Sequence, residues 1–158
     1  MSQLSQALMS EATFGRMLSD REVSRFTPAE IRGAIADLVA LEKTDLASAL
    51  CDAGLSLYPD SEDILAIAAL LAESRQDWTT AEQLLAQLIL KQAGTTPAAT
   101  WQHYIRVLRC LCELQSALQI TEHALQFHPT DPVLMKELES LMVMLGDSQP
   151  MQTTDTRH

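Results

Sequence analysis

Apolar residues recur at intervals of three and four along most of the chain, which is the pattern of a helix with one buried face. The clearest helix start is Thr27-Pro28-Ala29-Glu30, where the threonine can cap, the proline presets φ at the first position and the glutamate completes a capping box. The buried stripe that follows comprises Ile31, Ala34, Ile35, Leu38 and Leu41. This pattern predicts a helix that begins at Pro28.

A second helix is expected after a break at residues 43–45, and it should end at Tyr58-Pro59-Asp60 because proline cannot continue the backbone ladder. The same plan returns downstream as a second pair of helices, with a turn at residues 76–78 and a breaker cluster at residues 93–97. These two pairs predict two consecutive helical hairpins.

A third hairpin is expected between the breaker cluster and His128-Pro129, and a terminal helix after the cap at Asp131-Pro132. The turn inside this third hairpin has the weakest signal, because residues 111–115 contain no Gly, Pro or Asn. A single helix of about 30 residues is the alternative there, although that is well above the mean helix length.

The two ends of the chain differ from this plan. Residues 1–26 are expected to form a helical arm or N-terminal cap, with a helix from about Leu4 to Leu18 and a capping-box pattern at Ser19 to Glu22. Residues 27–146 would hold the hairpins and the terminal helix. Residues 147–158 are polar and lack periodicity, so we expect a disordered tail.

The spacing of the hairpins is informative. Ala47 and Ala81 are 34 residues apart (81 − 47), and Ala81 and Ala117 are 36 apart (117 − 81), with two extra residues in the loop at 94–97. The segments Ala47-x6-Gly54-x4-Pro59 and Ala117-x6-Ala124-x4-Pro129 resemble the second half of a tetratricopeptide repeat, which has a period of 34 residues. The resemblance implies an all-α fold, a right-handed α-solenoid (superhelix) of antiparallel helix hairpins.

The resemblance covers roughly Pro28 to Leu145 and is to a divergent member of the family. Ile35 and Ile105 stand where the family has a small residue, and the second hairpin lacks the closing proline. A generic array of α-helical hairpins is the alternative.

Charge and hydropathy narrow the range of partners. The net charge of −10 and the pI near 4.7 mean that the surface repels phosphate backbones and anionic lipids, so we expect neither nucleic acid nor membrane as a partner. The longest apolar run, Ile64 to Ala72, is about half of the ~20 residues that a spanning helix needs.

Residues that carry chemistry are sparse. The chain has no HExxH, Walker-type GxxxxGK or GxSxG motif and no ligand-spaced cluster, so we expect no catalysis, no cofactor and no metal site. The three cysteines Cys51, Cys110 and Cys112 are odd in number, which favours a reducing, cytoplasmic setting, and we expect them to be buried structural thiols.

The resemblance also implies a candidate site, because the first helices of tetratricopeptide repeats line a concave surface. The residues that would lie there are Arg32, Ala36, Val39, Asp63, Ile67, Leu70, Gln102, His103, Arg106, Arg109 and Lys136. Four of them are basic, which would give an acidic protein a basic inner strip that can hold an acidic or amphipathic peptide over the apolar Ile67 and Leu70. The alternative is that Arg106 and Arg109 pair with nearby carboxylates on a solvated face.

These observations favour a non-catalytic protein-interaction module, a peptide-binding adaptor or an assembly or secretion chaperone. The carboxylate-clamp pattern of co-chaperone repeats, with Lys and Asn on successive inner helices, is not matched, since Arg32 is followed by Ala36. The second hypothesis is a self-assembling subunit, for instance a homodimer, in which a Met-rich terminal helix with Met135, Met142 and Met144 docks on the first repeat of a neighbour.

Overall fold

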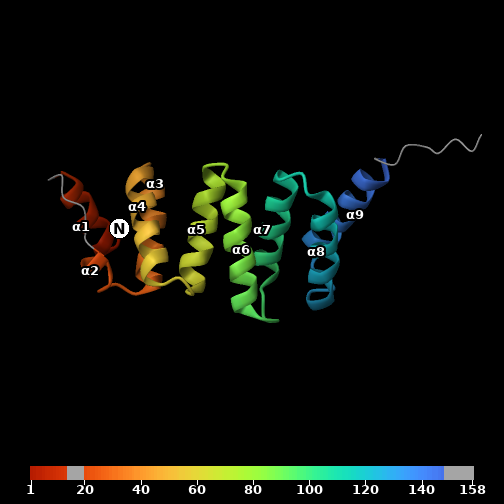
Figure 1. Cartoon of the computed structure of the whole chain (residues 1–158), viewed down its shortest axis with the longest axis horizontal. Coiled ribbons are helices and arrows are strands. Elements are labelled where there is room, and N and C mark those ends of the chain that lie inside the picture. The colour runs from red at the N-terminus through yellow and green to blue at the C-terminus, as the bar shows by residue number, and fades with distance from the viewer. Residues whose placement is uncertain (14–19, 148–158) are drawn as a thin grey trace, which may run out of the picture. The chain divides into compact units, whose positions relative to one another are not determined.

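A computed structural model describes residues 1–13 and 20–147 of the chain (Figure 1). The regular structure of these residues is entirely helical. The helices are α1 (Gln3–Thr13), α2 (Asp20–Val23), α3 (Pro28–Ala40), α4 (Thr44–Leu57), α5 (Glu62–Ser74), α6 (Trp78–Gln92), α7 (Ala98–Cys110), α8 (Leu114–Phe127) and α9 (Pro132–Asp147).

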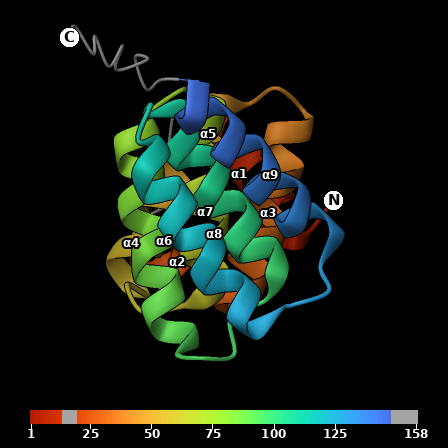
Figure 2. The ribbon, with the colours of Figure 1, turned by 90° about the vertical axis from the view of Figure 1, so that its right-hand side faces the viewer.

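The helices belong to two compact units, residues 1–93 with α1 to α6 and residues 94–158 with α7 to α9. In the first unit α3 packs on α4 and α5 packs on α6, as two consecutive hairpins, and α3 also contacts α5. In the second unit α8 packs on both α7 and α9 (Figure 2). The three predicted hairpins and the terminal helix are therefore present, and the single long helix over residues 111–115 is wrong.

The predicted helix start at Thr27 is confirmed in detail. The Glu30 amide donates to Thr27 Oγ1 at 3.3 Å, and the Thr27 amide donates to Glu30 Oε2 at 2.8 Å, so the capping box is complete. The bond from the Thr27 amide, aided by one from the Thr27 hydroxyl to the same oxygen at 2.9 Å, holds the pKa of the Glu30 carboxyl below its ordinary value. Pro28 occupies the first turn, where it removes no intrahelical hydrogen bond.

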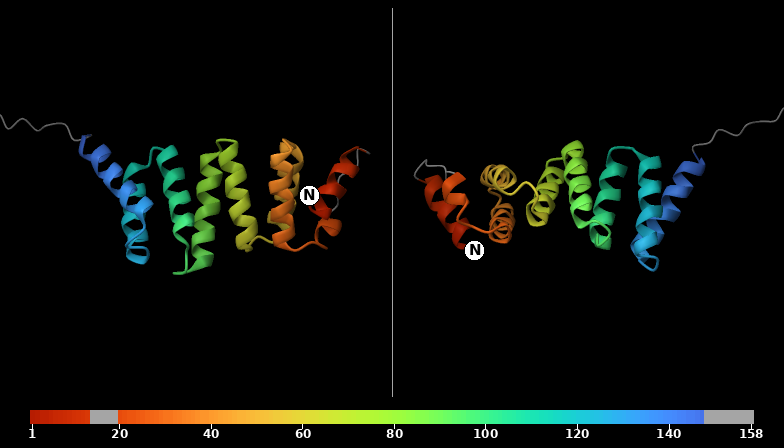
Figure 3. Two further views of the ribbon diagram at one scale, coloured as in Figure 1. Left: turned by 180° about the vertical axis from the view of Figure 1, so that it is seen from behind. Right: turned by 60° about the horizontal axis from the view of Figure 1, so that its bottom comes forward.

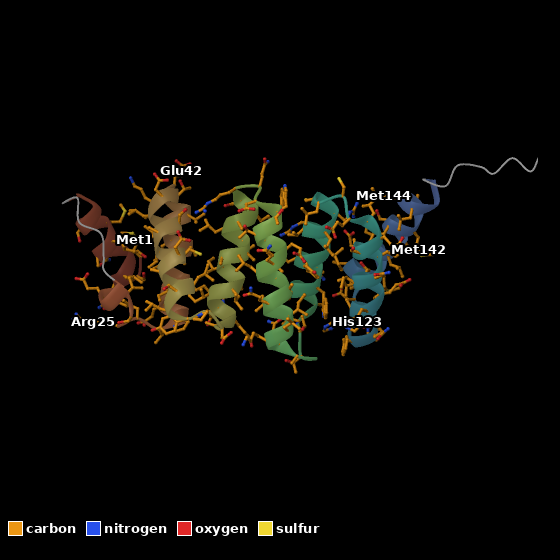
Figure 4. The ribbon with its side chains drawn as sticks, in the orientation of Figure 1. Met1, Arg25, Glu42, His123, Met142 and Met144 are labelled. Atoms are coloured by element: carbon orange, nitrogen blue, oxygen red, sulfur yellow. The ribbon has the colours of Figure 1, made fainter. Side chains whose placement is uncertain are left out.

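All three hairpins turn in the same way, through one residue with left-handed backbone. These residues are Glu42, Gln76 and Cys112, with φ of 58°, 60° and 60°. In each turn the next amide donates to the carbonyl five residues earlier, at 2.8–2.9 Å: Lys43 to Leu38, Asp77 to Ala72 and Glu113 to Leu108. This is the hydrogen bond of a Schellman motif, which closes the helix although none of the three residues is glycine. Figure 4 labels Glu42 at the turn between α3 and α4.

A glycine permits a close helix crossing in the first unit. Gly54 of α4 is buried, and a Cβ atom there would lie 3.3 Å from Ile31 Cγ2 on α3 and 3.3 Å from Ile64 Cδ1 on α5. The backbone of α4 therefore approaches both inner helices at once. Ala124, at the matching position of α8, is fully buried.

The first hairpin and the third hairpin each contain a polar contact that joins the start of the hairpin to its end. Tyr58 Oη donates to the Phe26 carbonyl at 2.9 Å, and His128 Nε2 lies 2.8 Å from the Thr96 carbonyl. Both ties span 32 residues and join the residue before the closing proline to the loop that precedes the first helix. His128 is half-buried and serves this structural tie.

The N-terminal helix α1 packs on α3, and α2 packs on α4 (Figure 3). One carboxylate anchors α1: Asp37 Oδ2 accepts from the Ser2 amide and from the Ser5 hydroxyl, both at 2.9 Å. Within the described residues, α1 (Gln3–Thr13) covers the first part of the helix predicted from Leu4 to Leu18. Residues 14–19 and the predicted tail after Asp147 lie outside the described residues.

The shared turn generates a prediction with a matched control. Replacing Gln76 by glycine should raise the free energy of unfolding by about 0.5 to 1 kcal/mol, because glycine adopts positive φ without the Cβ clash. The same substitution at Gln87, an exposed position in α6, should lower it by about 1 kcal/mol, since glycine costs stability inside a helix. Urea denaturation followed by circular dichroism measures both. A loss of stability in Gln76→Gly would contradict the turn geometry.

The Asp37 anchor generates a pH prediction. The hydrogen bond from the Ser2 amide, aided by Ser5, holds the pKa of Asp37 below its ordinary value. A lowered folded-state pKa means that the anchor is fully present above the ordinary pKa of about 4 and is lost as the pH falls through the lower value. At neutral pH Asp37→Ala should therefore release α1, seen as faster amide exchange in α1 with α5 and α6 unchanged. The exposed Asp52→Ala is the control, and unchanged exchange in α1 would exclude the anchor role.

Candidate functional site

An apolar groove lies between the inner helices α3 and α5 of the first unit. It has a volume of about 300 Å³ and is lined by Ile35, Ala36, Val39, Ala40, Ile67, Leu70, Leu71 and Ser74. Val39 and Leu70 are 40% and 48% exposed, which is high for large apolar side chains, and the small Ala36 and Ala40 leave space between them. The groove can accept an apolar side chain of another molecule.

One end of the inner helix pair carries an ion pair. Arg32, one turn before Ala36, donates from Nη1 to Asp63 Oδ1 at 2.8 Å, and Asp63 lies one turn before Ile67. The Arg32 side chain remains 56% exposed, so solvent screening keeps the contribution of this pair to stability small. A carboxylate of a bound partner can therefore replace Asp63 as the ion-pair partner of Arg32 at little cost in free energy.

A second pocket lies between α7 and α9 in the second unit, with a volume of about 370 Å³. Its lining residues are Gln102, Arg106, Arg109, Cys110, Val133 and Glu137. Arg109 Nη1 donates to Glu137 Oε2, and Arg109 Nη2 lies 3.6 Å from Met144 Sδ. The pocket is therefore mixed in character, and the charge of Arg109 is compensated by Glu137.

Asp131 organises the entrance of α9 beside this pocket. Its Oδ1 accepts from the amides of Val133 and Leu134 at 3.0 and 2.9 Å, which caps the helix. The same carboxylate accepts from Gln102 Nε2 at 3.1 and 3.3 Å. Gln102 thus ties α7 to the start of α9 and has a structural role besides lining the pocket.

The structure divides the predicted site residues into groups. Val39, Ile67 and Leu70 meet in the α3–α5 groove, and Gln102, Arg106 and Arg109 meet in the α7–α9 pocket. Arg32 and Asp63 pair with each other. His103 is half-buried and lines neither pocket, and Lys136 is exposed on α9 outside the pocket.

The structure pairs Arg109 with a carboxylate, as the alternative to a basic strip expected, but the sequence had not singled out Glu137 as that partner. Glu137 lies four residues after Val133 on the same face of α9, so its helical spacing placed it beside the pocket. In the first unit Arg32 is held by Asp63, and in the second unit Arg109 is held by Glu137, so neither arginine is an uncompensated basic residue.

The described part of the chain offers neither a membrane-spanning helix nor a cluster of metal ligands. No helix there is long and apolar enough to cross a membrane. No group of three or more His, Cys, Asp or Glu side chains among those residues is placed to hold a metal ion.

The fold is similar to solved tetratricopeptide structures. The first TPR of Spaghetti (RPAP3), bound to the HSP90 peptide SRMEEVD, matches with a TM-score of 0.64 and 13% identity, over 82% of this chain and 97% of that chain. The second TPR domain of human RPAP3, in complex with the HSP70 peptide SGPTIEEVD, matches with a TM-score of 0.61 and 18% identity, over 72% and 94%. MamA MSR-1 matches with a TM-score of 0.65 and 15% identity, over 89% and 84%.

No protein-family model and no curated protein sequence matches this chain. The structural similarity nevertheless confirms the predicted fold class: the chain is a TPR-like protein, an all-α solenoid built from antiparallel helix hairpins. At these identities the similarity establishes the fold alone.

The cysteines correct one prediction and generate a test. Cys51 is buried as expected, and burial, aided by Asp52, raises the pKa of its thiol to about 11. Cys110 and Cys112 are exposed, against expectation, because the chain turns at Cys112 and does not continue as a helix. An aromatic disulfide reagent at about pH 8 should therefore label two thiols rapidly.

Cys51 should react only slowly in the same experiment, because it is buried and about one thiol in a thousand would be ionised at that pH. Cys51→Ala should remove the slow phase and leave the rapid phase intact. Three equally fast thiols in the native protein would contradict the buried position of Cys51.

Proposed function

We propose that this protein is a non-catalytic interaction module that binds an amphipathic peptide segment of a partner protein along its inner helices. The observation that carries the proposal is the α3–α5 groove, whose lining is almost entirely apolar and includes the exposed Val39 and Leu70. An exposed apolar concavity of this kind is typical of an interaction surface.

The polar residues beside the groove select the character of the peptide. Apolar side chains of the peptide would enter the groove over Ile67 and Leu70. A neighbouring acidic side chain of the peptide would replace Asp63 as the ion-pair partner of Arg32. The α7–α9 pocket offers a similar combination, with Val133 beside Arg106 and Arg109. An amphipathic segment with acidic residues beside apolar anchors fits both surfaces, and a purely acidic one fits neither as well.

The similar structures support peptide binding without identifying the peptide. Two RPAP3 domains hold peptides that end in Glu-Glu-Val-Asp. This chain has Ala36 on the inner face of α3 one turn after Arg32, so the first unit offers an apolar wall where a clamp for a terminal carboxylate would need polar groups. We therefore expect its partner segment to be recognised mainly by apolar side chains.

An adaptor or an assembly chaperone of the cytoplasm is the role that fits such a module. Exposed thiols at Cys110 and Cys112 support a reducing compartment, because exposed thiols oxidise readily elsewhere. The acidic surface keeps nucleic acids and anionic membranes away from the grooves, which favours a protein partner.

Self-assembly is the second candidate, and α9 supplies the observation that favours it. Val133, Met135, Met142 and Val143 of this helix are exposed large apolar residues. Contiguous exposed apolar residues on a terminal helix of a solenoid are typical of a contact with a further element.

Selection from a displayed peptide library tests the peptide-binding proposal. Peptides enriched by the wild-type protein should share apolar anchors with flanking acidic residues, and their affinity is measured by fluorescence polarisation. Leu70→Asp should weaken binding at least about tenfold, which corresponds to about 1.4 kcal/mol, by placing a charge in the groove.

Leu90→Asp is the matched control, because Leu90 is 77% exposed on α6 and lies outside the groove. It should leave the affinity within about twofold of the wild type. Equal weakening by both variants, or no enriched peptide, would refute the α3–α5 groove as the binding site. Circular dichroism of both variants establishes that the helices remain folded.

A further inference from the structure

The outer face of α9 carries a distinct pattern of exposed residues. We define this face as Met135, Lys136, Glu139, Met142 and Val143, all of them exposed. Their spacing is i, i+1, i+4, i+7 and i+8, which places them along one side of the helix. Leu134 and Leu141, on the opposite side, are fully buried.

The apolar members of this face are prominent. Met135 is 49% exposed, Met142 is 58% exposed and Val143 is 62% exposed. Figure 4 labels Met142 and Met144 on α9. Met144 is not part of the outer face, because its sulfur contacts Arg109 of α7. The outer face is therefore separate from the α7–α9 pocket.

The charged members of the outer face also differ from the inner ones. Arg32 and Arg109 are held by carboxylates within the fold, whereas Lys136 and Glu139 have no hydrogen-bond or ion-pair partner among the described residues. The face thus combines an apolar row with one available cation and one available anion, three residues apart.

We propose that the outer face of α9 packs antiparallel against the same face of a second copy of this chain. In a twofold arrangement centred between residues 137 and 138, Lys136 of each copy faces Glu139 of the other, so both charges are satisfied twice. In the same register Met142 lies within two residues, about 3 Å along the helix axis, of the level of Met135 of the second copy, so the two side chains can meet. If the twofold axis instead passed at Glu139, the Glu139 carboxylates of the two copies would face each other. Their repulsion disfavours that register.

The sequence after α9 offers little to cover this face itself. Residues 148–158 contain one large apolar residue, Met151, among polar and charged residues. A second copy supplies a complementary apolar row and both counter-charges. A contact made by one helix of each copy buries less than the roughly 800 Å² per partner of a standard interface, so we expect a dimer of micromolar affinity.

This inference does not depend on the α3–α5 groove. It also differs from docking of the terminal helix on the first repeat of a neighbour, because a symmetric α9 pair closes on itself and forms a dimer, whereas a head-to-tail contact continues into longer assemblies.

Sedimentation velocity of the full chain, from about 1 μM to about 500 μM, tests the proposal. The wild type should shift from a monomer of 17.4 kDa to a dimer within this range. Met142→Asp should weaken the dimer at least about tenfold, because it buries a charge in the apolar row. Leu90→Asp on α6 is the matched control and should leave it unchanged. Both sites are exposed, so folding should be retained.

Charge reversal tests the register. Lys136→Glu alone and Glu139→Lys alone should each weaken the dimer at least about tenfold at low salt, because like charges then face each other twice. The double variant Lys136→Glu/Glu139→Lys should regain an affinity within about threefold of the wild type, since the charges are exchanged but still complementary.

Three outcomes would overturn the proposal: a monomer throughout the range, a dimer indifferent to Met142→Asp, or a double variant as weak as the single ones. Assemblies larger than a dimer would indicate the head-to-tail contact and would also overturn it. Loss of peptide binding in Leu70→Asp with an intact dimer would show that the two surfaces act separately.

Discussion

The close approach of α4 to two neighbouring helices is the constraint on which the first unit depends. Gly54 is wedged between Ile31 of α3 and Ile64 of α5, with space for no more than a tight Cβ contact on either side. Because α4 sits this close to both, α3 and α5 come into contact with each other. The groove between them exists because small residues on α3 then leave a gap that the large side chains of α5 do not fill.

The hairpin turns show how backbone hydrogen bonds can decide a conformation against side-chain preference. Glu42, Gln76 and Cys112 all adopt positive φ, which costs a residue with a Cβ atom about 1 kcal/mol or more. Each turn recovers this cost through the bond from the following amide to the end of the preceding helix. One turn geometry therefore recurs in all three hairpins although the residues at the turn differ.

The charged residues of the inner helices and those on the outer face of α9 differ in their ion pairing. Arg32 and Arg109 of the inner helices are joined to carboxylates of neighbouring helices, so these surfaces are locally compensated and apolar contact dominates their recognition. On α9 Lys136 and Glu139 lack such partners in the described part of the chain, and the apolar residues beside them are exposed. Exposed ion pairs contribute little to stability, but their arrangement discriminates between partners.

By itself the sequence determined the helices and their order. Its apolar periodicity, the capping box at Thr27, the prolines that close the first and third hairpins and the spacing of Ala47, Ala81 and Ala117 are local or periodic signals, and they sufficed for the all-α hairpin fold. The resemblance to tetratricopeptide repeats also placed Val39, Ile67 and Leu70 on the inner helices, where they line one groove. Only the tertiary structure decided the turn at Cys112, the exposure of Cys110, the tie of His128 and the pairing of Arg109 with Glu137. The physical reason is that these features depend on backbone hydrogen bonds and on contacts between residues about 30 positions apart, which no local pattern of polar and apolar residues encodes.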